Sequence, residues 1–152
     1  MMVNAVKRKA ALTVASLVCA TALGGCSMNG PTGQERADEL ASQLEDAGLG
    51  VKSAEATYLS SFSGDLTVSV ILKSDVVQPG YTVSAQTLGP ILGVVARGAA
   101  DMQVGGVGFY AEEEGGITIS MMTAADDLGI AEAVDGRSLT LTSERLDSLA
   151  KH

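Results

Sequence analysis

Apolar residues beyond residue 31 follow two different periods, and this change of period constrains the fold more than any other feature. Between residues 37 and 47 they recur at the three- and four-residue spacing of an amphipathic helix, whereas from 66 to 72 they fall on every second position, as in a strand. The same succession returns about fifty residues later. We therefore predict an α+β fold, a two-layer sandwich with helices on one face of a mainly antiparallel sheet of four to five strands.

The first helix has the clearest local signals. Thr32 followed by Glu35 is the pattern of a capping box, and Gly48 stands where a helix is usually ended. Its apolar stripe consists of Ala37, Leu40, Ala41, Leu44 and Ala47. A single narrow stripe predicts a helix that lies on a sheet rather than one surrounded by other elements.

Two strands are predicted to follow as a hairpin. The first covers 51–59 and the second covers 66–72, with Gly64 and polar residues between them. Phe62 lies at the tip of this connection. We expect its ring to fold back over the end of the sheet; the alternative is a binding contact on an exposed loop.

A second unit of helix, strand and strand is predicted after residue 83. Ser84 is a suitable cap, and Pro90 implies either a kinked helix or a late start with the proline in the first turn. Strands are expected at 104–111 and 117–121, joined by a turn at 112–116. The predicted order is therefore α-β-β-α-β-β, and an internal duplication is a hypothesis.

Short elements complete the predicted domain. A brief helix at 123–128 is followed by the turn signal Asp135-Gly136 and by a fifth, short strand that contains Leu139 and Leu141. A last helix is expected at 143–151.

The N-terminal segment has the layout of an export signal. Lys7-Arg8-Lys9 precedes the apolar run 10–23, which is shorter than the roughly 20 residues that a membrane-spanning helix needs. A basic start, a short apolar middle and small residues at the exit are typical of a cleaved signal rather than a permanent anchor.

Leu23-Gly24-Gly25-Cys26 closes that segment and resembles the lipobox of bacterial lipoproteins. The resemblance implies that Leu23, Gly24 and Gly25 are recognised by the signal peptidase and that Cys26 carries the lipid. Two or three acyl chains would hold the protein firmly on the membrane. The alternative is an ordinary secretory signal in which Cys26 is incidental.

The resemblance also implies the domain organisation. Residues 1–25 would be removed, 26–31 would form the lipidated cysteine and a tether, and 32–152 would form one globular domain on the extracytoplasmic side of the cell membrane. Outside the signal no second cysteine remains, because the other one is Cys19, so a disulfide within the chain is not expected.

Charge argues against a nucleic-acid partner. All 18 acidic residues follow Cys26, but only seven of the ten basic residues do, which leaves the mature chain at about −11. Such a surface repels nucleic acid and anionic head groups.

Catalytic and metal motifs are weak throughout. The only histidine is His152, so neither a Ser-His-Asp arrangement nor a His-based metal site is expected. The S-x-x-K pattern at 148–151 lacks its companion motifs, and the G-x-G-x-x-A pattern at 106–111 lies in a predicted strand. The acidic run 112–114 lies on a predicted turn and the run 126–127 on a predicted short helix. Both lack calcium-loop spacing and are expected to be solvated. No catalytic residue, metal or cofactor is predicted.

Three functions remain open at this point. The favoured one is a non-catalytic envelope module that binds an unknown envelope protein or wall component. The alternatives are a small-ligand-binding accessory of a transporter or receptor and a carboxylate-dependent hydrolase. The sheet face away from the helices should discriminate among them: an exposed apolar row, with Ile71 in it, favours a protein partner or a dimer, and a polar face with convergent carboxylates favours the alternatives.

Overall fold

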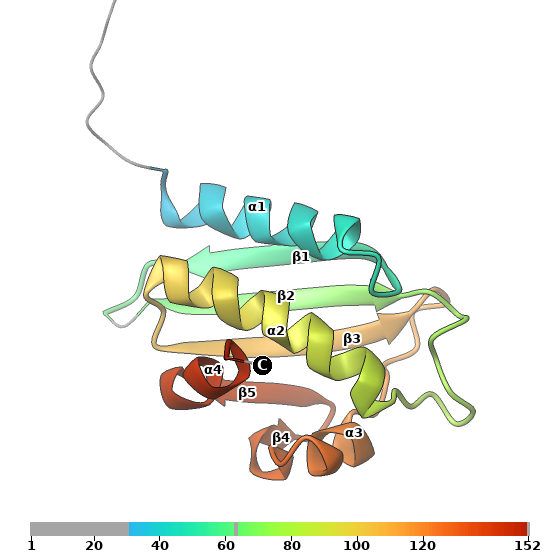
Figure 1. The fold of residues 1–152 in the computed structure, drawn as a ribbon. Coiled ribbons are helices and arrows are strands. Elements are labelled where there is room, and N and C mark those ends of the chain that lie inside the picture. The colour runs from blue at the N-terminus through green and yellow to red at the C-terminus, as the bar shows by residue number, and fades with distance from the viewer. Residues whose placement is uncertain (1–30, 63, 152) are drawn as a thin grey trace, which may run out of the picture.

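The computed structural model describes residues 31–62 and 64–151, which form a five-stranded sheet with helices packed on one face (Figure 1). The elements are α1 (Gly33–Asp46), β1 (Val51–Leu59), β2 (Asp65–Leu72), α2 (Ala85–Met102), β3 (Gly106–Glu113), α3 (Met122–Asp127), a 3-10 turn η1 (Ala131–Ala133), β4 (Val134–Asp135), β5 (Ser138–Thr142) and α4 (Ser143–Leu149). The predicted α+β class is confirmed.

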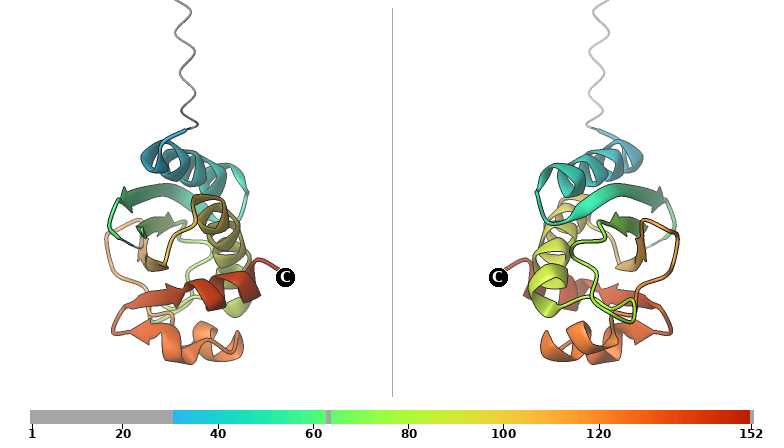
Figure 2. Two further views of the ribbon diagram at one scale, coloured as in Figure 1. Left: turned by 90° about the vertical axis from the view of Figure 1, so that its left-hand side faces the viewer. Right: turned by 90° about the vertical axis from the view of Figure 1, so that its right-hand side faces the viewer.

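The strands lie in the order β1-β2-β3-β5-β4. The β2–β3 pair is parallel and the other three neighbouring pairs are antiparallel, so the sheet is mainly antiparallel as predicted. Parallel neighbours need a crossover connection, and the 18 residues of α2 supply it. Figure 2 shows that α2 and α4 lie on one side of the sheet and that α1 lies over β1.

Helix α1 begins at the predicted capping box. The Glu35 N–H donates to Thr32 Oγ1 at 3.2 Å, and the Thr32 N–H donates to Glu35 Oε2 at 2.6 Å. The helix ends at Asp46, and Gly48 then adopts a φ of +69°, the left-handed conformation that glycine tolerates. Local hydrogen bonding therefore fixes both ends.

Helix α2 begins well before Pro90, so the proline does not lie in its first turn. Ser84 caps it and Pro90 lies inside it, so the alternative of a late start is wrong. Because proline has no N–H, the carbonyl of Gln86 loses its helical donor. The apolar residues Leu88, Ile91, Leu92 and Val95, which predict this helix in the sequence, are all buried, together with Gly93, Ala96 and Ala99.

The second unit departs from the expected pattern after β3. The turn forms, since the Gly116 N–H donates to the Glu113 carbonyl at 2.8 Å, but 117–121 has only isolated bridges and is not a strand of the sheet. The reason lies in the register: β5 occupies the edge of β3 from Gly106 to Tyr110 and leaves only its last residues for the returning segment. The second unit therefore has no counterpart of β2, and the duplication hypothesis does not extend to that strand.

The C-terminal predictions hold within a residue or two. The short helix, the fifth strand and the last helix are α3, β5 and α4, and β4 is an additional two-residue strand. Leu139, Leu141 and Leu146 are buried in the apolar cluster that also includes residues of α1, α2 and β1 to β3.

Candidate functional site

The sheet face away from the helices is polar. Hydroxyl and carboxyl groups occupy most of its outward positions: Ser53, Glu55, Thr57, Thr67, Ser69 and Thr140. Ile71 is only half-exposed, and Tyr110 is its one exposed aromatic neighbour on this face in the described strands. The exposed apolar row that would favour a partner on this face is not present among these residues.

A hollow of about 370 Å³ lies on this polar face and carries Glu55 and Glu112 on its margin. Glu55 of β1 lies opposite Ser69 of β2, and Ser69 in turn lies opposite Tyr110 of β3. Glu112 lies two residues further along β3 than Tyr110. The backbones of Glu55 and Glu112 are thus about 11 Å apart, from strand spacing and residue rise. Both residues are exposed. The two residues stand on strands that are not neighbours, at the margin of the hollow.

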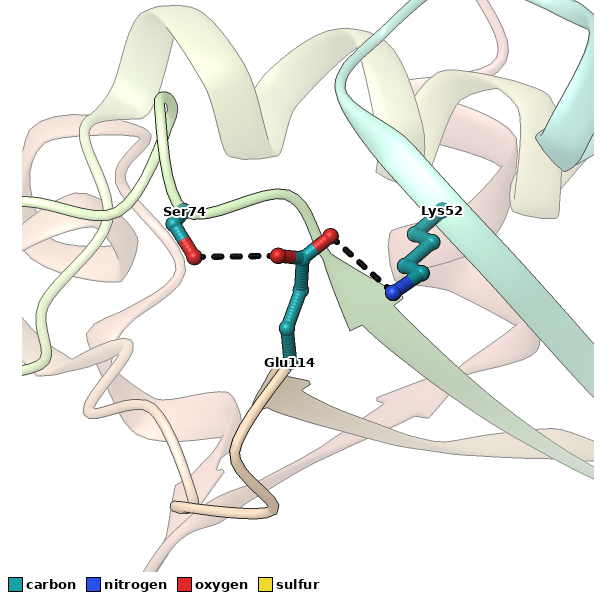
Figure 3. Close-up of polar contacts among 3 residues, drawn as sticks. All are labelled: Lys52, Ser74 and Glu114. Atoms are coloured by element: carbon teal, nitrogen blue, oxygen red, sulfur yellow. Dashed lines mark hydrogen bonds and ion pairs between the residues drawn. The ribbon is translucent and has the colours of Figure 1, made fainter.

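A polar cluster joins three segments at the end of the sheet where β1 begins (Figure 3). Lys52 Nζ lies 3.3 Å from Glu114 Oε1, and Ser74 Oγ donates to Glu114 Oε2 at 3.2 Å. Glu114 is therefore not the fully solvated residue that the sequence suggested. Both of its oxygens have protein partners, and the described part of the chain holds no group of three His, Cys, Asp or Glu residues that could bind a metal ion.

The two weak motifs found in the sequence lie in elements that do not provide the geometry their chemistry needs. Residues 106–111 belong to β3, as predicted, so the strand-to-helix turn of a dinucleotide site does not occur there. Ser148 is an exposed residue of the last turn of α4, and Lys151 is exposed beyond its end. His152 lies outside the described residues.

An apolar groove of about 740 Å³ runs along the outer side of α2. Its walls come from four helical segments and include Leu49, Pro90, Val94, Leu128 and Leu149. Gly89 and Gly93 lie one turn apart on the same side of α2, and Leu128 Cδ2 lies 3.2 Å from the position that a Cβ on Gly89 would occupy. Apolar side chains in the walls are only partly covered by the domain itself.

One charged residue lines this groove. Arg97 extends over Gly93, since its Nη1 lies 3.5 Å from the position that a Cβ on Gly93 would occupy. Gln86, whose carbonyl lacks a helical donor, lies toward the other end of the groove. The site thus combines an apolar surface with one guanidinium.

The sequence reasoning missed this groove because it considered only the buried stripe of α2. The available signal was the second side of the helix, where Gly89, Pro90, Gly93 and Val94 place small and apolar residues at positions expected to be polar.

Phe62 was predicted to fold back over the sheet, and this prediction is wrong. Its relative exposure is 113%, and the neighbouring Leu59 is 54% exposed. The chain turns tightly just before Phe62, since the Ser61 N–H donates to the Leu59 carbonyl at 2.8 Å, and the ring stands clear of the sheet.

The lipobox residues Leu23, Gly24, Gly25 and Cys26 lie outside the described residues, and lipidation therefore stays a prediction. Within residues 31–62 and 64–151, no helix combines the length and the apolar character that a membrane crossing requires. Comparison with known proteins yields no matching family model, no matching curated protein and no matching solved structure.

Proposed function

We propose that this protein is a lipoprotein of the bacterial envelope, tethered to the membrane through Cys26, that binds an apolar segment of another envelope protein without catalysing a reaction. The observation that carries the proposal is the groove along α2. The tether rests on the sequence resemblance at residues 23–26.

The groove favours an apolar segment that carries an acidic group. Apolar side chains that are left partly uncovered in a concave surface favour an interaction site, because their burial against a partner is favourable. The mature chain is strongly acidic, and Arg97 is the one cation in the groove lining. A carboxylate beside the partner's apolar anchors would therefore be attracted to Arg97 and repelled by the rest of the surface.

The orientation of the domain supports this function. The tether would enter at Thr32, and α1 separates that point from Ala47 and Leu49 at the edge of the groove. A 14-residue helix is about 21 Å long. A tether at Thr32 would therefore leave this part of the groove about 21 Å from the attachment point, where a partner can reach it.

A small ligand is the second candidate for the same groove. Its volume lies within the range of about 300–1,000 Å³ found for small-molecule sites. The ligand would be an amphiphilic anion, with its apolar part on Val94 and Leu128 and its charge on Arg97. The hydrolase alternative has weaker support, because Glu55 and Glu112 are both exposed to solvent, whereas a general-acid carboxyl is typically shielded from it.

Photo-crosslinking in the native host distinguishes these candidates. A photoreactive residue at Val94 of the full chain should give a discrete protein adduct that disappears when Arg97→Glu is added. The matched control at Thr140, on the polar sheet face, should give none. An adduct from Thr140 alone would contradict the proposal, and an amphiphile that copurifies and is lost with Arg97→Glu would favour the small-ligand function.

Lipid labelling tests the tether separately. Cys26→Ala should accumulate as the uncleaved precursor without lipid label, because the acylated sulfur is missing. Cys19→Ala, within the same leader, should be labelled and processed normally. Normal labelling of Cys26→Ala would refute the assignment of the lipobox.

A further inference from the structure

We propose that the exposed tip of the β1–β2 hairpin, formed by Phe62 and Leu59, contacts the lipid surface to which the chain is anchored. This inference rests on the proposed tether at Cys26. It assigns the domain a defined orientation on the membrane, with the hairpin tip against the lipid.

The first turn of α1 is fixed to the end of β1. Gln34 accepts a hydrogen bond from the Tyr58 N–H at 3.0 Å and donates to the Ala56 carbonyl at 3.0 Å. The Tyr58 ring occupies the space that a side chain on Gly33 would need. The place where the tether enters and the end of β1 therefore belong to one packed unit.

Covalent lengths allow the lipid and the hairpin tip to meet at the same end of the molecule. Six residue steps separate Cys26 from Thr32, a reach of at most about 22 Å. Four steps separate Tyr58 from Phe62, a reach of at most about 14 Å. In Figure 1, the start of α1 and the connection between β1 and β2 lie on the same side of the domain.

The hairpin presents its apolar side chains in a braced turn. The Gly64 N–H donates to the Ser61 carbonyl at 3.2 Å, and Ser61 Oγ donates to Asp65 Oδ2 at 3.0 Å. Phe62 has no covering contact, with its relative exposure of 113%. A preformed tip loses little conformational freedom on insertion, and the tether keeps it at a high effective concentration near the lipid.

Charge selects the kind of lipid surface. Three acidic residues are exposed at the tethered end of the domain: Glu35, Asp65 and Asp101, the last of them in the C-terminal turn of α2. Arg36 donates a hydrogen bond to the Asp101 carbonyl at this end. Carboxylates repel anionic head groups. The tip is therefore suited to a zwitterionic surface, which an apolar residue enters without that repulsion.

Tryptophan fluorescence on an anchored chain tests the contact. The protein has no Trp, so Phe62→Trp introduces a single reporter at an exposed position. Residues 26–152, which include every described residue, are coupled through the Cys26 thiol to a maleimide lipid in phosphatidylcholine vesicles. We expect a blue-shifted emission and a loss of intensity when the acyl chains are brominated, relative to the same variant free in buffer.

Tyr81→Trp is the matched control, because Tyr81 is also an exposed aromatic residue, in the loop between β2 and α2. Its emission should be the same with and without vesicles. An unshifted, unquenched Phe62→Trp signal would overturn the inference, as would equal quenching of both reporters. Since the thiol coupling supplies the anchor, these results do not depend on acylation in the cell, and a failed lipid-labelling experiment would not alter them.

Discussion

Replacing two glycines of α2 by alanine should have opposite effects on stability, and the difference tests the packing of α1 on α2. At Gly98 a new Cβ would lie 2.8 Å from Leu40 Cδ1 and 3.2 Å from Leu40 Cγ, and Leu40 is 1% exposed. At Gly93 the nearest atoms are 3.5 and 4.0 Å away, which is ordinary van der Waals contact. Only the Gly98 position is too crowded for a methyl group.

The magnitudes decide the sign at each position. Alanine in a helix interior is favoured over glycine by about 1 kcal/mol. Overpacking in a filled core costs about 1–3 kcal/mol. Gly93→Ala should therefore raise the free energy of unfolding by about 0.5–1 kcal/mol, whereas Gly98→Ala should lower it by about 1 kcal/mol, because the new methyl group would displace the buried side chain of Leu40.

Urea denaturation followed by circular dichroism measures both variants against the unchanged protein. A difference of about 2 kcal/mol between them should appear as a change in midpoint at constant slope. If Gly98→Ala proves as stable as Gly93→Ala, the close contact between the helices is not as described, and the reasoning fails.

Three further predictions concern α1 and the end of the sheet. Leu44→Asp should lower the free energy of unfolding by about 5 kcal/mol and unfold the domain, because it places a charge at a fully buried position. The control variant Ser42→Asp changes an exposed residue and should melt almost as the unchanged protein does. Hydrogen bonds from Thr32, first from its backbone N–H and then from its hydroxyl, lower the pKa of Glu35 from its ordinary 4.5. The free energy of unfolding should therefore fall as the pH drops through that lowered pKa. Glu35→Gln should flatten this part of an acid-unfolding curve. A double-mutant cycle with Lys52→Met and Glu114→Gln should give a coupling below about 1 kcal/mol that weakens with salt; a larger, salt-independent value would contradict the exposed character of the pair.

The first half of the fold was readable from neighbouring residues. The reciprocal hydrogen bonds of Thr32 and Glu35 act over three positions, so the sequence contains the whole of that signal. The strand from Val51 to Leu59 was predicted with the observed bounds, and the next strand with one residue less than β2 has. For the second of these strands, the signal was an apolar residue at every second position: Leu66, Val68, Val70 and Leu72.

The second half of the fold depended on which segments pair with the free edge of β3, and local sequence patterns do not indicate this. Residues 117–121 have the alternation of a strand, yet β5 takes most of the edge of β3 on which they would pair. The parallel pairing of β2 with β3 follows likewise from the crossover through α2 and not from either strand's own residues. Sequence predicts that a segment is extended, but not which neighbour it will have.

The candidate site divides in the same way. The lipobox at 23–26 is a linear motif and needs no tertiary structure to be recognised, whereas the groove is made of the ends of α1, α3 and α4 around the middle of α2. The exposure of Phe62 also depends on a tight turn whose geometry the composition of the loop did not specify.

The sequence by itself determined the helix start at Thr32, the hairpin of β1 and β2, the acidic surface and the α+β class. These properties arise from hydrogen bonds within a few residues, from the period of apolar side chains, or from charge counts. Only the tertiary structure decided the order of the strands, the separation of Glu55 from Glu112 and the apolar groove beside Arg97. Each of these depends on distant segments that occupy the same space, and that outcome is set by packing of the whole domain.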